Sequence, residues 1–589
     1  MYAIKRYCRY ICRRTLKKLD LSASLYGVKV KTRAEAIAVL TAVDQEYEVV
    51  AGESWGRPCR LFKNAPNNLR ELFESSRSDE TFIVYEDERL TFDETQRKVA
   101  RIANILVTQY GVKKGDRVAI SMRNYPEWIM AFNAITSIGS IAVAMNSLWQ
   151  SEEMEFGLRD SGAKVLFADD ERIRRLTAIN ANFDVEVIAV RVEELPSGNF
   201  RHLDDLLSDE LGESLPDIEI APGDPATILY TSGSTGHPKG AVSSHLNILS
   251  ALMSWELEAK ISLYMSGEAP PDLPYQSATL LAVPLFHATG SHAVMLMSYR
   301  NQRKIVSMYR WDVAEAMRLI EEEQISSFVA PAAMTGDLVN AAAASDHDLS
   351  SLLVVGGGGA PRAPEQVKNI AGKFINALPS TGWGMTETNA IGTGIGGLDY
   401  VQHPSSSGRV SALLDLRVLD ENGTELKSGE RGELQVRGVS VIQGYWDRPD
   451  ANAETFDGEW LRTGDVAYLD EEGYLYIVDR IKDLVIRGGE NIGCAEVEAG
   501  LLEHPHVLEA SVYAVPDDRL GEEVGATIYC EGFDDVVALR EFLGDVMARF
   551  KIPRYINFSS EPLPRIASGK INKRLMREAF VSSMPVENT

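Results

Sequence analysis

Short apolar runs recur between residues 117 and 355, and each has the length of a single buried strand. Segments whose apolar residues recur with helical spacing separate these runs, as in the stretch that begins at Thr91. Buried strands that alternate with amphipathic helices predict layers of α/β structure around largely parallel sheets. The runs are RVAISM (117–122), KVLFAD (164–169), VEVIAV (185–190), TLLAVP (279–284) and LLVV (352–355).

The pattern changes near Leu414. From there to Arg480, short alternating runs are joined by turn signals at Asn422-Gly423 and Gly473, which predicts a small β-barrel-like part. After Arg480, helical and strand patterns alternate over roughly 110 residues, enough for a small α+β domain. We therefore expect an N-terminal extension (1–66), a large α/β domain (67–480) and a small C-terminal domain (481–589).

One uncharged stretch, residues 128–151, is long enough to cross a bilayer. Polar residues such as Asn133 and Ser140 interrupt it, and Pro126 just before it suits the first turn of a helix. We therefore predict a buried helix followed by a strand, rather than a membrane span.

Composition and charge narrow the class of protein. The chain is 45% hydrophobic and 25% charged, as in an ordinary soluble protein, and its net charge of −25 argues against a nucleic-acid partner. Five scattered cysteines without zinc-like spacing, and no secretory signal, favour reduced thiols in the cytoplasm.

Residues 1–18 hold seven Lys or Arg and no acid. This segment is either a frayed basic tail or a peripheral membrane contact.

The stretch TSGSTGHPKG, Thr231 to Gly240, follows a predicted strand. Its glycines let backbone N–H groups approach phosphates, and its lysine adds positive charge. It does not fit the Walker pattern, because Pro238 stands where the second glycine is required. A dinucleotide pattern at Gly392, Gly394 and Gly397 has no strand leading into it, and we interpret it as a glycine-rich loop. The sequence thus predicts a phosphate loop of another kind.

From Leu69 to Arg577 the chain resembles the acyl-adenylate-forming superfamily, which includes acyl- and aryl-CoA synthetases, luciferases and peptide-synthetase adenylation domains. The resemblance rests on eight motifs in the expected order, and it is close to fatty-acid–CoA ligases. The motifs are YTSGSTGHPKGAVSSH (230–245), PLFHATG (284–290), GGGGAP (356–361), GWGMTET (382–388), GELQVRG (432–438), RTGD (462–465), DRIKDLVIRGGEN (479–491) and LPRIASGKINKR (563–574).

The resemblance implies roles in ATP binding. The loop would hold the β- and γ-phosphates, Thr386 would contact the α-phosphate, and Glu387 with Thr231 would hold Mg²⁺. Asp465 and Arg480 would bind the ribose, and Trp383, in place of the usual tyrosine, would stack on the adenine. The other implied ATP contacts are Ser232, Gly233, Ser234, Thr235, Gly236, Lys239, Gly359, Ala360, Pro361, Gly384 and Met385.

The resemblance also implies two half-reactions. Lys570, on a mobile C-terminal domain, would bridge the carboxylate and the α-phosphate, where two anions meet. The small domain would then rotate at Lys482, and Gly488 and Gly489 would line a channel for coenzyme A. His287 would open or close this passage.

These features predict an AMP-forming carboxylic acid–CoA ligase that uses ATP, Mg²⁺ and coenzyme A. Peptide-synthetase domains carry an aspartate just after the phenylalanine of PLFHATG, whereas His287 stands there in this chain, so an amino acid is disfavoured. The expected walls are small and apolar, which favours a hydrophobic, fatty acid. Transfer to a carrier-protein thiol is the alternative, and the oligomeric state, including a homodimer, stays open.

Overall fold

The computed structural model describes residues 32–178, 185–207, 212–231, 238–267, 269, 272–358, 362–488, 490–517, 519–565 and 571–583. It describes the backbone of residues 482 and 491 without their side chains. The basic tail at residues 1–18 therefore lies outside the described residues.

The predicted layers of α/β structure are confirmed. A first sheet runs in the order β21-β11-β10-β6-β5-β7-β8-β9, parallel from β10 to β9, with β11 and β21 added antiparallel at one edge. Its strands are β5 (Arg117–Ser121), β6 (Ile141–Ala144), β7 (Val165–Asp169), β8 (Glu186–Val190), β9 (Phe200–His202), β10 (Pro225–Thr231), β11 (Lys239–Ser244) and β21 (Gly444–Tyr445). The helices that accompany it are α4 (Phe92–Thr108), α5 (Pro126–Ser137), α6 (Ser151–Ser161), α7 (Asp170–Thr177) and α8 (Leu203–Leu206).

A second sheet runs in the order β18-β17-β16-β15-β14-β12-β13-β3-β4 and is parallel from β16 to β3. Its strands are β3 (Thr81–Tyr85), β4 (Glu88–Thr91), β12 (Ala278–Leu281), β13 (Lys304–Ser307), β14 (Ser327–Val329), β15 (Val354–Gly356), β16 (Leu378–Thr381), β17 (Thr393–Gly396) and β18 (Arg409–Val410). The glycine-rich stretch at 392–397 was expected to be a loop, and that expectation is wrong. It contains β17, which continues this sheet next to β16.

Helices lie on both faces of the second sheet. The chain steps in one direction from β13 through β14 and β15 to β16, and right-handed crossovers then place α11 (Val313–Glu322), α12 (Ala332–Ala342) and α13 (Pro364–Lys373) on one face. The step from β12 to β13 runs the other way, so the π-helix η1 (Thr289–Leu296) and α10 (Met297–Arg300) cover the opposite face. The long helix α9 (His245–Ser266) contacts η1 there.

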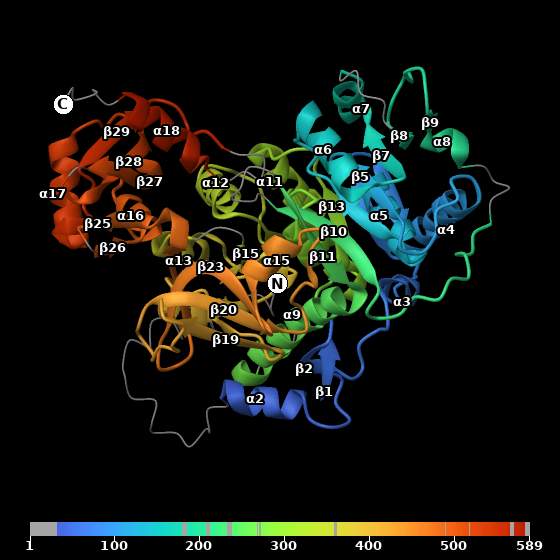
Figure 1. The fold of residues 1–589 in the computed structure, drawn as a ribbon, viewed down its shortest axis with the longest axis horizontal. Coiled ribbons are helices and arrows are strands. Elements are labelled where there is room, and N and C mark those ends of the chain that lie inside the picture. Colours follow the sequence, from blue (N-terminus) through green and yellow to red (C-terminus); the bar gives the residue numbers. More distant parts are fainter. Residues whose placement is uncertain are drawn as a thin grey trace.

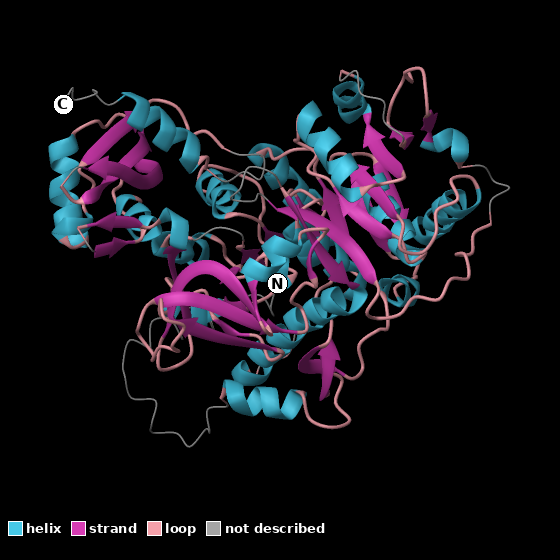
Figure 2. Ribbon diagram, viewed as in Figure 1, coloured by secondary structure: helices cyan, strands magenta, loops and turns pink. Residues whose placement is uncertain are grey.

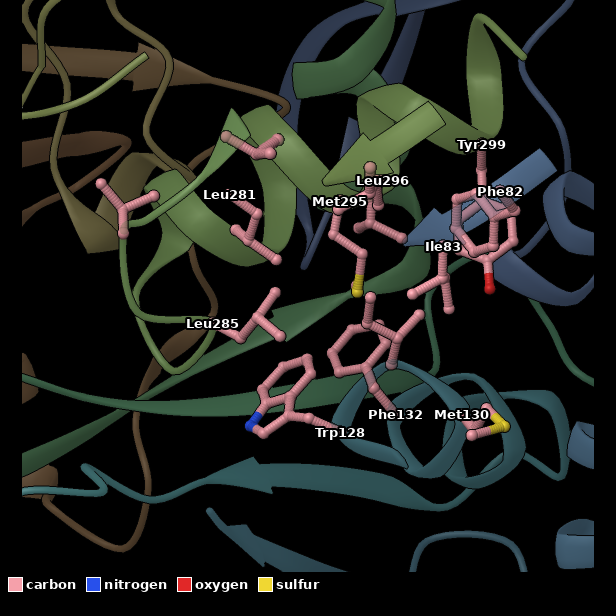
Figure 3. Packing of buried hydrophobic residues seen from close by; sticks show 14 of the residues in the cluster. Phe82, Ile83, Trp128, Met130, Phe132, Leu281, Leu285, Met295, Leu296 and Tyr299 are labelled. Atoms are coloured by element: carbon pink, nitrogen blue, oxygen red, sulfur yellow. The ribbon is translucent and has the colours of Figure 1, made fainter. Parts of the chain in front are cut away.

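The uncharged stretch at 128–151 forms α5 followed by β6, as predicted. Within the described ranges, no helix is both long enough and apolar enough to cross a membrane. The α5 side chains instead pack against the second sheet in a shared core, where Trp128 stacks on Phe132 and Phe82 contacts Tyr299 at 4.3 Å between ring centroids (Figure 3). The two layered units are thus joined by one core.

The region after Leu414 is antiparallel, as its turn signals predict, and Gly423 and Gly473 adopt left-handed φ values of 79°. Figure 2 shows its curved strands. They are β19 (Leu414–Leu419), β20 (Gly432–Gly438), β22 (Phe456–Asp457), β23 (Trp460–Leu469) and β24 (Leu475–Arg480), with α15 (Pro449–Thr455) alongside.

The chain beyond Arg480 forms an α+β unit with its own hydrophobic core, and it lies to one side of the layered units (Figure 1). The domain boundary proposed at Arg480 coincides with the end of β24. The elements are η3 (Ile481–Asp483), β25 (Val485–Arg487), β26 (Glu490–Ile492), α16 (Cys494–Leu501), β27 (Val507–Asp517), β28 (Gly521–Cys530), α17 (Val536–Val546), η4 (Arg549–Lys551), β29 (Tyr555–Ser559) and α18 (Lys573–Ser583).

Residues 32–66 contribute α2 (Arg33–Leu40) and the hairpin of β1 (Val49–Ser54) and β2 (Arg57–Phe62), ahead of α3 (Leu69–Ser75). They pack against α9, whose Met253, Leu257 and Ile261 are buried in the same hydrophobic cluster.

A buried ion pair fixes α7 to the first sheet. Arg172 is fully buried and contacts Asp169 at 3.0 Å, and its Nε donates to the Ser147 carbonyl. We expect Arg172→Met to lower the free energy of unfolding by about 3 kcal/mol, because it leaves a buried carboxylate without its cation. The measurement is urea unfolding followed by circular dichroism.

The exposed Arg174→Met, on the same helix, serves as the control and should change the free energy of unfolding by about 0.5 kcal/mol or less. Equal effects of both would contradict the argument.

Candidate active site

A large cleft, with a volume of about 2990 Å³, lies between the layered units and the C-terminal unit. Residues at the carboxyl ends of strands from both sheets line it, including Thr231 of β10, Val329 of β14 and Thr381 of β16. Open α/β sheets bind ligands at this end of their strands. Those residues predicted from sequence for ATP binding that the structure describes all line this cleft.

The two ends of the predicted phosphate loop are adjacent in space. Thr231 and Lys239 are register partners in the β10–β11 hairpin, and both line the cleft. The Lys239 ammonium lies 5.3 Å from the ring centroid of Tyr445. Ser232, Gly233, Ser234, Thr235 and Gly236 lie outside the described residues.

Glu387 lies in the short 3-10 helix η2 (Thr386–Thr388) and is buried, with 7% of its surface exposed. The Tyr445 hydroxyl donates to its Oε1 at 2.7 Å, while Oε2 accepts no hydrogen bond from the described residues. Burial first, and then the neighbouring Glu387 carboxylate, raise the pKa of Tyr445, so this phenol remains a donor at neutral pH. A buried carboxylate with one oxygen available, beside the Thr386 hydroxyl, fits a magnesium ion that is also bound by phosphates.

Tyr445 was not identified from the sequence. It connects Glu387 with Lys239, because β21 pairs with β11 and places Tyr445 opposite Ala241. This pairing joins segments about two hundred residues apart in the chain, and no local motif signals it.

The backbone around η2 is strained. Asn389 and Ala390 follow it directly with φ values of 56° and 62°, which non-glycine residues rarely adopt. Gly384 on the other side is required by close approach, since a Cβ there would lie 2.5 Å from the Ala390 carbonyl oxygen. Strain of this kind persists where the surrounding fold imposes it, often at functional sites.

Asp465 and Arg480, the predicted ribose-binding pair, are register partners on β23 and β24. The Arg480 Nε contacts Asp465 Oδ1 at 2.6 Å, and the Trp383 indole nitrogen donates to Oδ2 at 2.8 Å. Each carboxylate oxygen has two lone-pair positions, so a carboxylate suits the two hydroxyls of a ribose. The pair therefore holds a buried acceptor in a fixed orientation.

Trp383 thus has a polar contact in addition to its predicted stacking role. One part of its ring lies against Gly392, where a Cβ would approach the indole to 2.4 Å. Trp383 as a whole is 9% exposed. The stacking on adenine stays a prediction, and Gly359, Ala360 and Pro361, expected to form a wall of the adenine slot, lie outside the described residues.

We expect Trp383→Phe to raise KM for ATP about tenfold with a smaller effect on kcat, because it removes a hydrogen bond that orients Asp465 and keeps an aromatic ring. Steady-state kinetics of pyrophosphate release would measure this. Trp311→Phe is the matched control, since its indole also donates to a carboxylate, Asp337, at 2.9 Å. A similar KM change in the control would show that the effect is not specific to Asp465.

His287 lines the cleft just before η1, and its ring packs against Phe286 with 4.4 Å between ring centroids. Gly290 in η1 approaches the backbone so closely that a Cβ would lie 2.2 Å from the Pro284 carbonyl oxygen. A π-helix at such a position often marks a functional site.

The C-terminal unit presents one of its sides to the cleft. Arg565, Ile571 and Lys573 line it, and Lys570, between them in sequence, lies outside the described residues. Gly488 is exposed just after β25 and is not among the described residues that line the cleft, and Gly489 is not described. Lys482 belongs to η3, just after β24.

Glu387, the Asp465–Arg480 pair and the C-terminal unit meet at one cleft, an arrangement that agrees with the predicted acyl-adenylate-forming class. The family model for AMP-binding enzymes matches residues 72–446, and the model for the AMP-binding enzyme C-terminal domain matches residues 496–570.

Known proteins agree with this class. The chain is 32% identical to the long-chain-fatty-acid–CoA ligase FadD13 of Mycobacterium tuberculosis, over 85% of this chain and 95% of that protein. It is 32% identical to a feruloyl-CoA synthase of Amycolatopsis, over 83% and 94%. One similar solved structure is the o-succinylbenzoate coenzyme A synthetase of Bacillus subtilis in complex with ATP and magnesium. The two structures superimpose with a TM-score of 0.74 at 27% sequence identity, over 87% of this chain and 99% of that one. The chain belongs to the AMP-binding enzyme family, and it is an AMP-forming acid–CoA ligase.

Proposed function

We propose that the acid is hydrophobic, with fatty acids as the first candidates. The observation that carries this is the wall that continues from His287, where the cleft-lining residues Ala288, Ala293 and Met297 are small or apolar. Apolar walls bury an aliphatic chain and provide no partner for an α-amino group. The relatives are named for different carboxylic acids, so their names do not select one substrate class, and this apolar wall does.

In the first half-reaction, the acid carboxylate attacks the α-phosphorus of ATP, and pyrophosphate leaves. Lys239 and the hydroxyl-rich loop would bind the β- and γ-phosphates, Thr386 the α-phosphate, and Asp465 with Arg480 the ribose. Glu387 and Thr231 would hold Mg²⁺, which supplies positive charge that stabilises the departing pyrophosphate. Support comes from the position of each described residue in one cleft.

Lys570 would neutralise the charge that builds up where the two anions meet. Its described neighbours Arg565 and Ile571 line the cleft, which supports this role. For the second half-reaction, the C-terminal unit would rotate at Lys482 and bring Gly488 and Gly489 to the cleft. The coenzyme A thiol then attacks the acyl carbon, AMP leaves, and His287 controls the passage.

The test is mass spectrometry of the products formed from ATP, Mg²⁺, coenzyme A and a panel of carboxylic acids. We expect AMP and the CoA thioester of a hydrophobic acid. A CoA thioester formed only with short polar acids would overturn the proposed substrate class. Accumulation of acyl-adenylate without thioester would favour delivery to a carrier protein.

A further inference from the structure

Arg303 lies between α10 and β13, at the amino end of the second sheet. The next residue, Lys304, pairs with Glu323 at the end of α11, at 2.7 Å. Successive residues at a strand point to opposite faces, so Arg303 points to the other face, which η1 and α10 cover. It lines the same cleft as the ATP-binding residues.

The Arg303 guanidinium has no partner among the described residues. Its Nε is buried without a hydrogen bond, and the group forms no ion pair with them. Burial lowers the pKa of Arg303, which reflects the cost of keeping this cation away from water. Arg362, a buried arginine of the cleft lining, differs because it donates to the Thr335 hydroxyl at 3.2 Å.

The carboxylates of α9, the helix that contacts η1 on this face, are already paired. The acidic residues of α9 are Glu256 and Glu258, and each makes two hydrogen bonds to an arginine: Glu256 to Arg300, and Glu258 to Arg33. The closest contact is 2.6 Å in both pairs. Arg303 therefore remains as a half-buried cation, with its Nε buried and with no anion beside it among the described residues. Such a charge is costly unless something else neutralises it.

The position of Arg303 relative to the reacting end is set by the sheet. β12 and β13 are parallel, with Ala278 opposite Lys304, and His287 follows the carboxyl end of β12. The rise from Ala278 to Leu281 alone is about 10 Å. Arg303 and the chemistry are therefore at opposite ends of this strand pair, and the apolar wall with Ala293 and Met297 covers the same face.

We infer that Arg303 binds an anionic group at the far end of the acid, so that the substrate is an α,ω-dicarboxylic acid with an aliphatic body. This inference rests on the proposed function and specifies its substrate. One carboxylate would react with ATP, and the other would pair with the guanidinium, whose fork matches a carboxylate with two hydrogen bonds. Diacids too short to reach from the reacting end of the cleft to Arg303 gain no affinity from this contact.

The test compares a homologous series of α,ω-dicarboxylic acids with monocarboxylic acids of equal chain length, by kcat/KM for pyrophosphate release. We expect the wild type to prefer the longer diacids by about tenfold or more, because a site built for a polar group rejects the analogue that lacks it. Arg303→Met should remove this preference and keep or raise the activity with monoacids. Arg303→Lys should retain part of it, and the exposed Arg318→Met should leave it unchanged.

Binding provides a second measurement that does not need turnover. Saturating long diacid should raise the melting temperature of the wild type and not that of Arg303→Met. A preference for monoacids at every chain length, or a diacid preference that survives in Arg303→Met, would overturn the inference and leave the CoA ligase assignment intact. No pyrophosphate release with any acid of either series would overturn the proposed hydrophobic substrate, and this inference with it.

Discussion

Glu387→Gln is expected to lower the rate of adenylate formation by about 10²–10³-fold. The amide preserves the shape of the side chain and its contact with Tyr445, and it removes the negative charge that Mg²⁺ requires. The loss should be partly reversed by raising the magnesium concentration, because a weaker site is filled by mass action. Pyrophosphate release measured across a magnesium titration would show both effects.

Tyr445→Phe is the matched control for this variant. It removes the 2.7 Å hydrogen bond to Glu387 and keeps the carboxylate charge, so we expect about a tenfold loss at most and little change in the magnesium requirement. If Glu387→Gln behaved like Tyr445→Phe, the metal-binding role of Glu387 would be wrong.

Lys570→Ala is expected to reduce adenylate formation by about 10³-fold, because it removes the cation between two reacting anions. The second half-reaction, started from supplied acyl-adenylate and coenzyme A, should be unchanged, since Lys570 would have left the cleft. Measuring the two half-reactions separately distinguishes this role from a general loss of folding.

Arg574→Ala serves as the control for Lys570→Ala. Arg574 follows Lys570 closely in the sequence, its side chain is 83% exposed, and among the described residues it pairs only with Glu578 on its own helix. Both half-reactions should keep their rates in this variant. An equal loss of both half-reactions in Lys570→Ala would contradict the assigned role.

Most of the fold could be predicted from the sequence. The strands at Arg117–Ser121 and Val165–Asp169, and the helix–strand unit at 126–144, follow directly from the spacing of apolar residues. The strand at Thr393–Gly396 was missed, because four of the six residues in GTGIGG are glycines, which have no side chain to signal burial. Its pairing with β16 depends on a neighbouring strand, which local pattern does not contain.

The candidate site was predictable as a set of residues and not as a set of contacts. The order of the motifs predicted Asp465 and Arg480 as ribose-binding residues. Their pairing on adjacent strands agrees with a shared role in binding one group. The contacts of Tyr445 with Glu387, and the missing partner of Arg303, depend on segments far apart in the chain. Burial and pairing of charged groups are properties of the packed molecule, so no local sequence pattern carries them.

The packing of residues 32–66 on α9 has a practical consequence for anyone who shortens this protein. A version trimmed to begin near residue 72, where the family model begins, would lose α2, β1 and β2. The apolar surface of Met253, Leu257 and Ile261 would then face water, and Glu258 would lose Arg33. Exposed apolar patches of this kind promote aggregation, so such a version is expected to express poorly even though every motif residue is present.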